Sequence, residues 1–395
     1  MTELQSLFRA QWSTGMVPQI VYDSSVALGA YEPRHRTWAT AGLCPPGVAT
    51  SGICQPPVHA IALARVRAIA AGRDDGSIDG VDRAIVDLYP RLAAWHRWLH
   101  TVRDPDGTGL VTVFHPWESG LDNSPRWDDA LAAVAVTDEA AGPRPDLAHV
   151  GDPAERPSDN EYLRYHTLVR ELVDVGYDPA RAHRTHPFRV ADVLFTAILA
   201  AADDTLADLA AIAGRPADAD HHRAGAERSR RGLDACWDPD RCATLDRDLV
   251  ADRWIAADTI AGFAPLVAGC DADRAEALAG RLAGPSFAGA SGLRWPVPPT
   301  TAVDDPAFDP RSYWRGPTWP VLTWLLWWAL ERDGHHARAD ALRDAAIDQL
   351  RASGCSEYAD PLTGEPLGST DQSWTAAVAL DWLACDPADM ADLTA

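Results

Sequence analysis

The stretch "GPTWPVLTWLLWWALERDGHHARADALRDAAIDQLRA", residues 316–352, contains two helical segments of different character. The first, 317–333, is apolar nearly all round, as a buried helix is. The second, 335–353, has one apolar stripe and a charged face, as a surface helix does. Only the short connector "ERDGHH" separates them. The stretch therefore predicts an inner helix followed directly by an outer helix.

The same alternation recurs elsewhere in the chain. The segments "PFRVADVLFTAILAAADDTL" (187–206) and "STDQSWTAAVALDWL" (369–383) are apolar nearly all round, whereas "ADADHHRAGAERSRRGLDAC" (217–236) has a single apolar stripe. An alternation of buried and surface helices describes an inner ring inside an outer ring. The simplest solid of this kind is an all-α (α/α)6 toroid, which normally has twelve helices.

Apolar residues spaced three and four apart predict about eleven helices. These cover residues 3–12, 56–71, 81–102, 160–176, 187–213, 217–236, 255–268, 272–284, 317–333, 335–353 and 371–384. We expect residues 1–395 to form one domain. The connectors that precede inner helices are long and rich in Pro, Gly and Trp, and such loops on one end of a scaffold are where binding and chemistry are expected. They lie at about 13–55, 104–130, 285–316 and 354–370.

Composition excludes several classes of function. A net charge of -22 argues against nucleic acid and anionic lipid as partners, because affinity for both depends on basic patches. The sequence contains no lysine, which removes Schiff-base chemistry and phosphate-binding Walker loops. No apolar run is long enough to span a bilayer, and the first residues do not resemble a signal peptide, so we expect a cytoplasmic protein. Seven scattered cysteines without a CxxC pair are expected to be reduced.

Neither a metal nor a cofactor is proposed. The segment "DADHH" (218–222) has residue types that bind metals, but two adjacent histidines point to different sides of a helix, so a solvated face is the preferred interpretation. The turn "DPDGTG" (104–109) does not meet the calcium-loop pattern, because His115 stands where a glutamate is needed.

The loop "WESGLDNSPRWDD", residues 117–129, carries four acidic residues and two tryptophans. A turn explains only its Gly, Asn, Ser and Pro. Aromatic side chains beside isolated carboxylates at a cavity mouth are typical of sugar sites, and glycoside hydrolysis needs two carboxyl groups, one protonated and one ionised. From the residues alone, Asp122 is either a turn-forming residue or a catalytic one. Glu118, the other local acid, is expected to support the loop by accepting hydrogen bonds.

Six stretches, in order along the chain, resemble the glycoside hydrolases of family 63, and within them the bacterial mannosylglycerate and glucosylglycerate hydrolases, whose domain is described as MGH1-like. They are "QWSTGMVPQIVY" (11–22), "SGICQPPVHA" (51–60), "WESGLDNSPRWD" (117–128), "DPAERPSDNEYLRY" (152–165), "SYWRGPTWP" (312–320) and "EYADPLTGEPLGSTDQSWTAA" (357–377). A single tetrapeptide is a weak match, but the ordered set is specific and spans nearly the whole chain. The resemblance implies a six-hairpin glycosidase fold.

The resemblance also implies an inverting glycosidase mechanism. The general acid of the S-G-x-D motif falls on Asp122, and the general base of the C-terminal E-Y-x-D-P-x-T-G stretch falls on Glu357. In an inverting enzyme the two carboxyl groups lie about 6.5–9.5 Å apart, so that one water fits between them. Asp122 is expected to be protonated at neutral pH, through desolvation near Trp117 and Trp127, while Glu357 stays ionised.

The substrate implied is a small glycoside with a carboxylate aglycone: glucosylglycerate is placed ahead of mannosylglycerate, and water is the second reactant. Gln55 and Arg156 match the family's glycerate pocket, with Tyr162 nearby, and a guanidinium suits a carboxylate. Arg156 has the alternative of an ion pair with Asp152, Glu155 or Asp159.

Three further residues match sugar and water positions of the family: Tyr313, Trp314 and Gln372. Tyr313 and Trp314 have the alternative of core packing. The segment "WLLWWAL" is interpreted as core, because its aromatic residues wind around a helix.

One departure from the family concerns the start of the chain. Relatives carry an inner helix with a Trp-x-x-Asp-type motif before the segment that matches "ELQSLFRAQW". We therefore expect a toroid without its first inner helix, with exposed apolar flanks on the neighbouring helices. The alternative function is an inactive or weakly active homologue that binds the glycoside without hydrolysing it. A terpene-cyclase-like enzyme is disfavoured because the loops lack an acid-rich diphosphate-metal motif.

Overall fold

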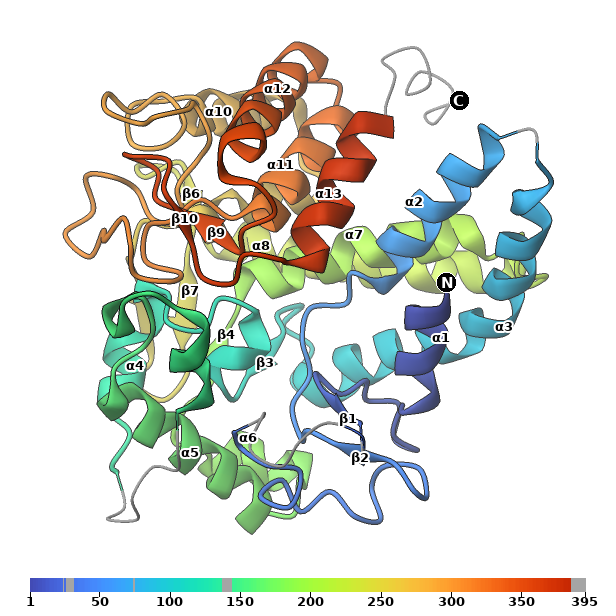
Figure 1. Cartoon of the computed structure of the whole chain (residues 1–395). Helices are drawn as coiled ribbons and strands as arrows, with labels where there is room; N and C mark the ends of the chain where they lie inside the picture. Colours follow the sequence, from blue (N-terminus) through green and yellow to red (C-terminus); the bar gives the residue numbers. More distant parts are fainter. Residues whose placement is uncertain (24, 26–31, 74, 137–143, 385–395) are drawn as a thin grey trace.

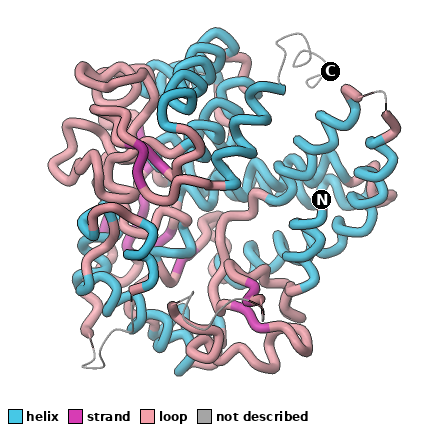
Figure 2. Tube along the Cα trace, in the orientation of Figure 1, coloured by secondary structure: helices cyan, strands magenta, loops and turns pink. Residues whose placement is uncertain are grey.

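The computed structural model describes residues 1–395 except 24, 26–31, 74, 137–143 and 385–395. Helices dominate the described residues, and short strands lie in the loops between them (Figures 1 and 2). The helices are α1 (Thr2–Arg9), α2 (His59–Ala71), α3 (Ser77–Trp98), α4 (Asp128–Ala132), α5 (Asp159–Asp174), α6 (Pro179–Thr185), α7 (Val193–Leu209), α8 (Ala219–Ala235), α9 (Ala264–Ala268), α10 (Ala272–Leu282), α11 (Pro320–Arg332), α12 (His336–Ser353) and α13 (Ser373–Ala384).

The predicted alternation of inner and outer helices is confirmed by burial along α7 and α8. Nearly every residue from Val193 to Ala202 on α7 is buried. On α8 the buried residues recur every three or four positions: they are His222, Gly225, Ala226, Ser229, Gly232 and Leu233. The inner helix α7 packs against α8, α9, α2 and α3. It supplies residues to both clusters of buried apolar side chains in the molecule.

The pair α11 and α12 repeats this arrangement. Eight of the thirteen residues of α11 are buried, whereas α12 buries the stripe that contains Ala339, Leu342 and Ala346. Helix α13 departs from the expectation of a fully buried inner helix. Its side chains Leu380 and Leu383 are 68% and 66% exposed, whereas Val378 and Trp382 on the same helix are buried and α13 packs on α11 and α12.

Short strands interrupt the predicted all-α pattern without changing its class. A four-stranded antiparallel sheet has the order β3 (Thr112–Val113), β4 (Val190–Ala191), β7 (Asp246–Asp248) and β8 (Arg253–Ile255). Three strand pairs lie elsewhere: β1 (Val21–Tyr22) with β2 (Ala49–Thr50), β5 (Trp237–Asp238) with β6 (Ala243–Thr244), and β9 (Tyr358–Ala359) with β10 (Pro366–Leu367).

The predicted helix over 255–268 is wrong over most of its length. Strand β8 ends at Ile255, a 3-10 turn covers Ile260–Phe263, and only α9 is α-helical. A continuous helix would place Pro265 in its interior, where proline lacks the donor for an intrahelical hydrogen bond. In the structure Pro265 lies in the first turn of α9, which tolerates it. Helix α6 was not predicted; Asp178 caps it by accepting a hydrogen bond from the Arg181 N–H at 2.8 Å.

The four long loops predicted from the sequence contact one another. The Asn123 side chain joins the second loop to the third, because its Oδ1 accepts a hydrogen bond from the Trp314 N–H at 3.0 Å. The third and fourth loops meet where the Arg294 N–H donates to the Pro361 carbonyl. The elements of the scaffold therefore bring together segments that lie far apart in the sequence.

Among the described helices, none has the length and apolarity needed to cross a bilayer.

Candidate active site

The loop that carries Asp122 is held in one conformation by its own hydrogen bonds. A 3-10 turn covers Pro116–Ser119, and Gly120 follows with φ +77°, a backbone conformation that suits glycine. His115 Nδ1 accepts a hydrogen bond from the Trp117 N–H at 3.0 Å, and its Nε2 bonds the Tyr165 carbonyl. Burial lowers the pKa of His115 to about 3, so the ring is neutral at physiological pH.

Glu118 supports this loop, as predicted. It is fully buried and forms an ion pair with Arg103, whose Nη1 lies 2.8 Å from its Oε2. It also accepts hydrogen bonds from the N–H groups of Phe114 at 2.7 Å and Cys54 at 3.3 Å. The bond to Cys54 ties the second loop to the first. No sequence motif marks Arg103, because it lies at the end of the helical segment that precedes the loop.

A second buried ion pair fixes the far end of the loop. The Arg126 guanidinium donates to Asp192 at 2.6 Å and to Asp246 at 2.6 and 2.7 Å. Asp192 caps the inner helix α7 by accepting from the N–H groups of Leu194 and Phe195. Sequence reasoning missed these three residues, although an arginine between Pro125 and Trp127 was a signal. The loop is thus anchored at both ends to the helical scaffold.

Asp122 lies between these anchors and is half-buried. Burial raises the pKa of Asp122 to about 7. The charge of Glu357 adds to this rise, whereas the Arg156 guanidinium and a hydrogen bond from Tyr313 oppose it. The predicted direction of the pKa shift, and desolvation as its main cause, are confirmed. Because Arg156, Glu357 and Tyr313 all act on Asp122, the structure brings these predicted residues into one site.

Glu357 lies at the start of β9 and is buried. Its Oε2 accepts a hydrogen bond from the Ser369 N–H at 3.0 Å and lies 2.7 Å from the Arg156 Nη2. Gly368 permits this close packing, since a Cβ added there would lie 2.5 Å from Glu357 Oε2. Glu357 was not among the partners foreseen for Arg156.

Tyr313 and Trp314 occupy different places in the site wall. The ring of Tyr313 is half-buried, and the Arg156 guanidinium lies 4.3 Å from its centroid. Trp314 is buried and stacks on Trp319 with ring centroids 3.5 Å apart. Tyr313 therefore belongs to the charged part of the site, and Trp314 lies in the packed wall beside it.

The remaining predicted residues lie around this centre. Gln55 Nε2 donates to the Trp117 carbonyl at 3.1 Å, which connects the first loop to the second. The Arg144 guanidinium lies over the Tyr162 ring, 3.6 Å from its centroid, and burial raises the pKa of Tyr162. The Gln372 N–H donates to the Cys355 carbonyl, two residues before Glu357.

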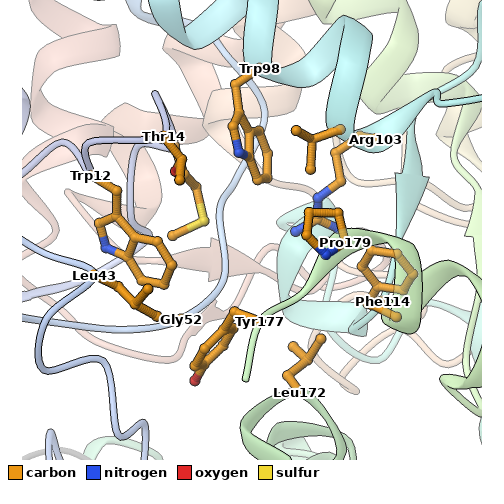
Figure 3. Close-up of a pocket in the computed structure, with 13 residues that line it drawn as sticks. Trp12, Thr14, Leu43, Gly52, Trp98, Arg103, Phe114, Leu172, Tyr177 and Pro179 are labelled. Carbon is orange, nitrogen blue, oxygen red and sulfur yellow. The ribbon is translucent and has the colours of Figure 1, made fainter. Parts of the chain in front are cut away.

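An apolar cavity of about 150 Å³ is lined in part by Arg103 and Phe114, but neither Asp122 nor Glu357 lines it (Figure 3). Four of its thirteen lining residues are aromatic, among them Trp12, Trp98 and Tyr177. Two of the polar atoms in this lining already have partners: Trp12 Nε1 donates to Thr50 Oγ1, and the Tyr177 hydroxyl donates to the Trp38 carbonyl. A sugar needs polar groups to bind its hydroxyls. This cavity therefore does not have the chemistry of the sugar site.

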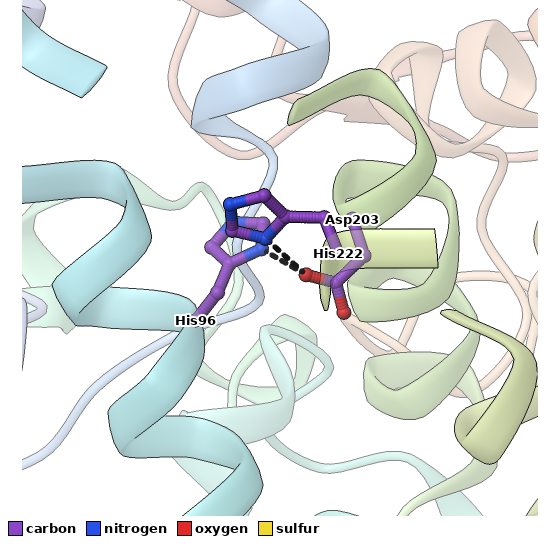
Figure 4. Close-up of side chains that lie close together, drawn as sticks. All are labelled: His96, Asp203 and His222. Atoms are coloured by element: carbon purple, nitrogen blue, oxygen red, sulfur yellow. Dashed lines mark hydrogen bonds and ion pairs between the residues drawn. The ribbon is translucent and has the colours of Figure 1, made fainter. Parts of the chain in front are cut away.

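A buried cluster of His96, Asp203 and His222 joins α3, α7 and α8 (Figure 4). His222 belongs to the "DADHH" segment, so the expected solvated face is wrong for it, while its neighbour His221 is exposed. His96 Nδ1 lies 2.7 Å from Asp203 Oδ1, and His100 Nε2 lies 2.6 Å from Asp203 Oδ2. Two nitrogen or oxygen ligands of one tetrahedral zinc are about 3.3 Å apart. The shorter distances are those of hydrogen bonds, and we interpret the cluster as a carboxylate shared by imidazoles.

The family model described as mannosylglycerate hydrolase MGH1-like glycoside hydrolase domain matches residues 1–375. The chain is 44% identical to a glucosylglycerate hydrolase of Mycolicibacterium hassiacum, over 96% of this chain and 86% of that protein. It is 38% identical to a mannosylglycerate hydrolase of Rubrobacter radiotolerans, over 96% and 85%.

A solved structure, the GH63 mannosylglycerate hydrolase from Thermus thermophilus in complex with Tris and D-glycerate, is also similar to this chain. Its TM-score is 0.86, at 38% identity, over 96% of this chain and 87% of that one.

Proposed function

The chain belongs to the MGH1-like glycoside hydrolase family, and from this premise we propose that it hydrolyses glucosylglycerate to glucose and glycerate with inversion at the anomeric carbon. The observation that supports this most directly is that two carboxyl groups with different surroundings lie in one site. Burial raises the pKa of Asp122 to about 7, while Glu357 is held by a guanidinium. Two carboxyl groups with opposite protonation states are what glycoside hydrolysis needs.

In the proposed reaction, Asp122 is the general acid and Glu357 the general base. The Asp122 carboxyl donates its proton to the glycosidic oxygen as the bond between this oxygen and the anomeric carbon breaks. A water oxygen forms a bond to the anomeric carbon from the opposite face, and Glu357 accepts the proton that this water loses. The products are the sugar with inverted anomeric configuration and glycerate. Inversion requires the two carboxyl groups to lie about 6.5–9.5 Å apart, which stays a prediction.

The substrate assignment depends on the relatives and on the charge of the site. A relative named glucosylglycerate hydrolase is more similar to the chain than those named mannosylglycerate hydrolase, at 44% against 37–38% identity. This supports our choice of glucose ahead of mannose. The solved relative bound to D-glycerate supports a carboxylate aglycone. Arg156 is buried beside Asp122 and Glu357, so a cation is present for that carboxylate.

The test is to supply glucosylglycerate and mannosylglycerate separately and to follow the first-formed sugar anomer by proton NMR. We expect faster release of glucose than of mannose, and initial accumulation of the anomer opposite to that of the substrate. Retention of configuration would contradict the assigned roles of Asp122 and Glu357. Binding of the glycoside by calorimetry without hydrolysis would identify the inactive homologue instead.

A further inference from the structure

Arg156 holds the residue proposed as general base. Its Nη2 lies 2.7 Å from Glu357 Oε2, and its Nη1 faces Glu357 Oε1 at 3.5 Å. Both side chains are nearly buried, with 8% and 7% of their surface exposed. The guanidinium thus presents its terminal edge to Glu357. A charge-assisted contact of this kind in a buried site is strong.

The other edge of the same guanidinium lacks a protein partner. Within the described part of the chain, Arg156 Nε is buried and forms no hydrogen bond. A guanidinium has five donors in a fixed plane, and its Nε side can donate two parallel hydrogen bonds to a carboxylate. The Tyr313 ring, 4.3 Å away, fixes the orientation of that plane. The structure therefore leaves two donors of the guanidinium edge beside the base without a second carboxylate.

Glu357 in this state is poorly placed to accept a proton. Its Oε2 already accepts from Arg156 and from the Ser369 N–H, and its Oε1 faces Arg156 Nη1. A general base needs an oxygen that is free to accept the proton of the attacking water. The guanidinium competes with that water for the same lone pairs. Base catalysis thus requires the hold of Arg156 on Glu357 to weaken.

We infer that Arg156 is a specificity-determining residue that releases Glu357 for base catalysis only when the substrate brings its own carboxylate. The inference rests on the proposed function and adds a coupling between aglycone recognition and base activation. One cation shared by two anions binds each less strongly than it binds one alone. A carboxylate on the Nε edge of Arg156 therefore draws the guanidinium away from Glu357.

This coupling differs from simple binding of the aglycone in its kinetic signature. If Arg156 only binds the carboxylate, a neutral substrate analogue has a higher KM and an unchanged kcat. If Arg156 releases the base, the neutral analogue leaves Glu357 paired, and kcat itself falls. The suitable analogue is glucosylglycerol, which has a hydroxymethyl group in place of the carboxylate. Comparison of the two substrates separates the two roles.

The experiment measures kcat and KM of the wild type and of Arg156→Gln with glucosylglycerate and with glucosylglycerol. In the wild type we expect kcat to be lower for glucosylglycerol by about tenfold or more, the effect of one hydrogen bond to a charged group. In Arg156→Gln we expect kcat to fall for glucosylglycerate but to rise for glucosylglycerol. The inference is overturned if Arg156→Gln lowers kcat equally for both substrates, or if the wild type has equal kcat values for them.

The pH profile of kcat/KM is a second measurement, and it should not shift if Arg156 has only a structural role. The groups that act on Asp122 are Arg156, Glu357 and Tyr313, and Arg156 lowers the pKa of Asp122. Loss of the guanidinium in Arg156→Gln should therefore move the alkaline limb of kcat/KM to higher pH. The coupling is contradicted if the alkaline limb of kcat/KM does not shift in Arg156→Gln and the ratio of kcat values for the two substrates stays unchanged.

Two further variants serve as controls. Arg156→Lys keeps the charge without the planar fork, and we expect intermediate behaviour. Arg311→Gln removes a nearby arginine that contacts Glu155 and Glu365. This variant should change kcat by the same factor for both substrates. Thermal melting of each variant checks the fold. Absence of turnover of either charged glycoside by the wild type overturns the proposed function, and the coupling with it.

Discussion

At the scale of single residues, Asp122 and Glu357 differ in the charges and donors around their carboxyl groups. Desolvation dominates at Asp122 and raises its pKa to about 7. Glu357 receives hydrogen bonds from a guanidinium and from a backbone N–H. The sequence motifs identified both acids, but they did not indicate that Arg156 pairs with Glu357. Two of the residues that the sequence offered as its partners have other contacts: Asp152 accepts a hydrogen bond from the Ala154 N–H, and Asp159 pairs with Arg144.

Neutral replacement of either acid should stop the reaction. We expect Asp122→Asn and Glu357→Gln each to remove nearly all turnover of glucosylglycerate, by a factor of about 10² or more, while melting temperatures change little. Matched changes of exposed acids in the same loops, Asp129→Asn and Glu365→Gln, should leave turnover within about twofold. Activity retained in Asp122→Asn would remove the proposed mechanism.

The pH dependence follows from the pKa of Asp122. A general acid must carry its proton, so kcat/KM should fall as pH rises through about 7. The raised pKa also means that the folded state holds this proton more tightly than the unfolded state. Stability relative to Asp122→Asn should therefore decrease as pH rises from 3.8 to about 7 and then stay constant. Initial rates and melting temperatures across this range test both effects; a flat rate profile to pH 9 would falsify the assignment of the acid.

At the scale of elements, the loop that carries Asp122 is anchored because its two ends are ion-paired to different parts of the scaffold. Glu118 joins it to Arg103 at the end of the helical segment after α3, and Arg126 joins it to the start of α7 and to β7. The sequence indicated the role of Glu118 from its position in the loop. It did not indicate the partners, because Arg103, Asp192 and Asp246 have no local pattern that distinguishes them from surface charges.

Removal of the Glu118 charge should destabilise the fold. In Glu118→Gln the buried Arg103 loses its counter-charge, and breaking a buried pair costs about 3–5 kcal/mol. Denaturant unfolding should show a lower midpoint. The same substitution at Glu276, an exposed partner of Arg338, should change stability little. Equal midpoints for the two variants would contradict the role of Glu118 as an anchor.

At the scale of the whole molecule, helices from the two ends of the chain meet. Asp381 on α13 forms an ion pair with Arg65 on α2 at 2.8 Å and accepts a hydrogen bond from Trp324 Nε1 on α11 at 2.8 Å. Figure 1 shows α13 between α11 and α2. Helix α7 supplies residues to both apolar clusters and so connects them. The arrangement of one domain over residues 1–395 remains our proposal.

Replacement of the residue at this junction should weaken the fold. Asp381→Asn removes the carboxylate charge that pairs with Arg65, and we expect a loss of about 1–3 kcal/mol in the free energy of unfolding. On the same helix, Leu380 is 68% exposed, so Leu380→Ser should stay within about 0.5 kcal/mol of the wild type. Differential scanning calorimetry of both variants gives the comparison, and a larger loss in Leu380→Ser would contradict the exposed position of Leu380.

The sequence by itself determined the alternation of inner and outer helices. The spacing of apolar residues in each segment indicates whether a helix is buried on all sides, as in 187–206, or along one stripe, as in 217–236. Its loop motifs also identified Asp122 and Glu357. Only the tertiary structure decided which charges meet: Arg156 with Glu357, Arg103 with Glu118, and three histidines around Asp203. These contacts join residues that are far apart in the chain or hidden within helices. Their energies depend on burial and distance, which local sequence does not encode.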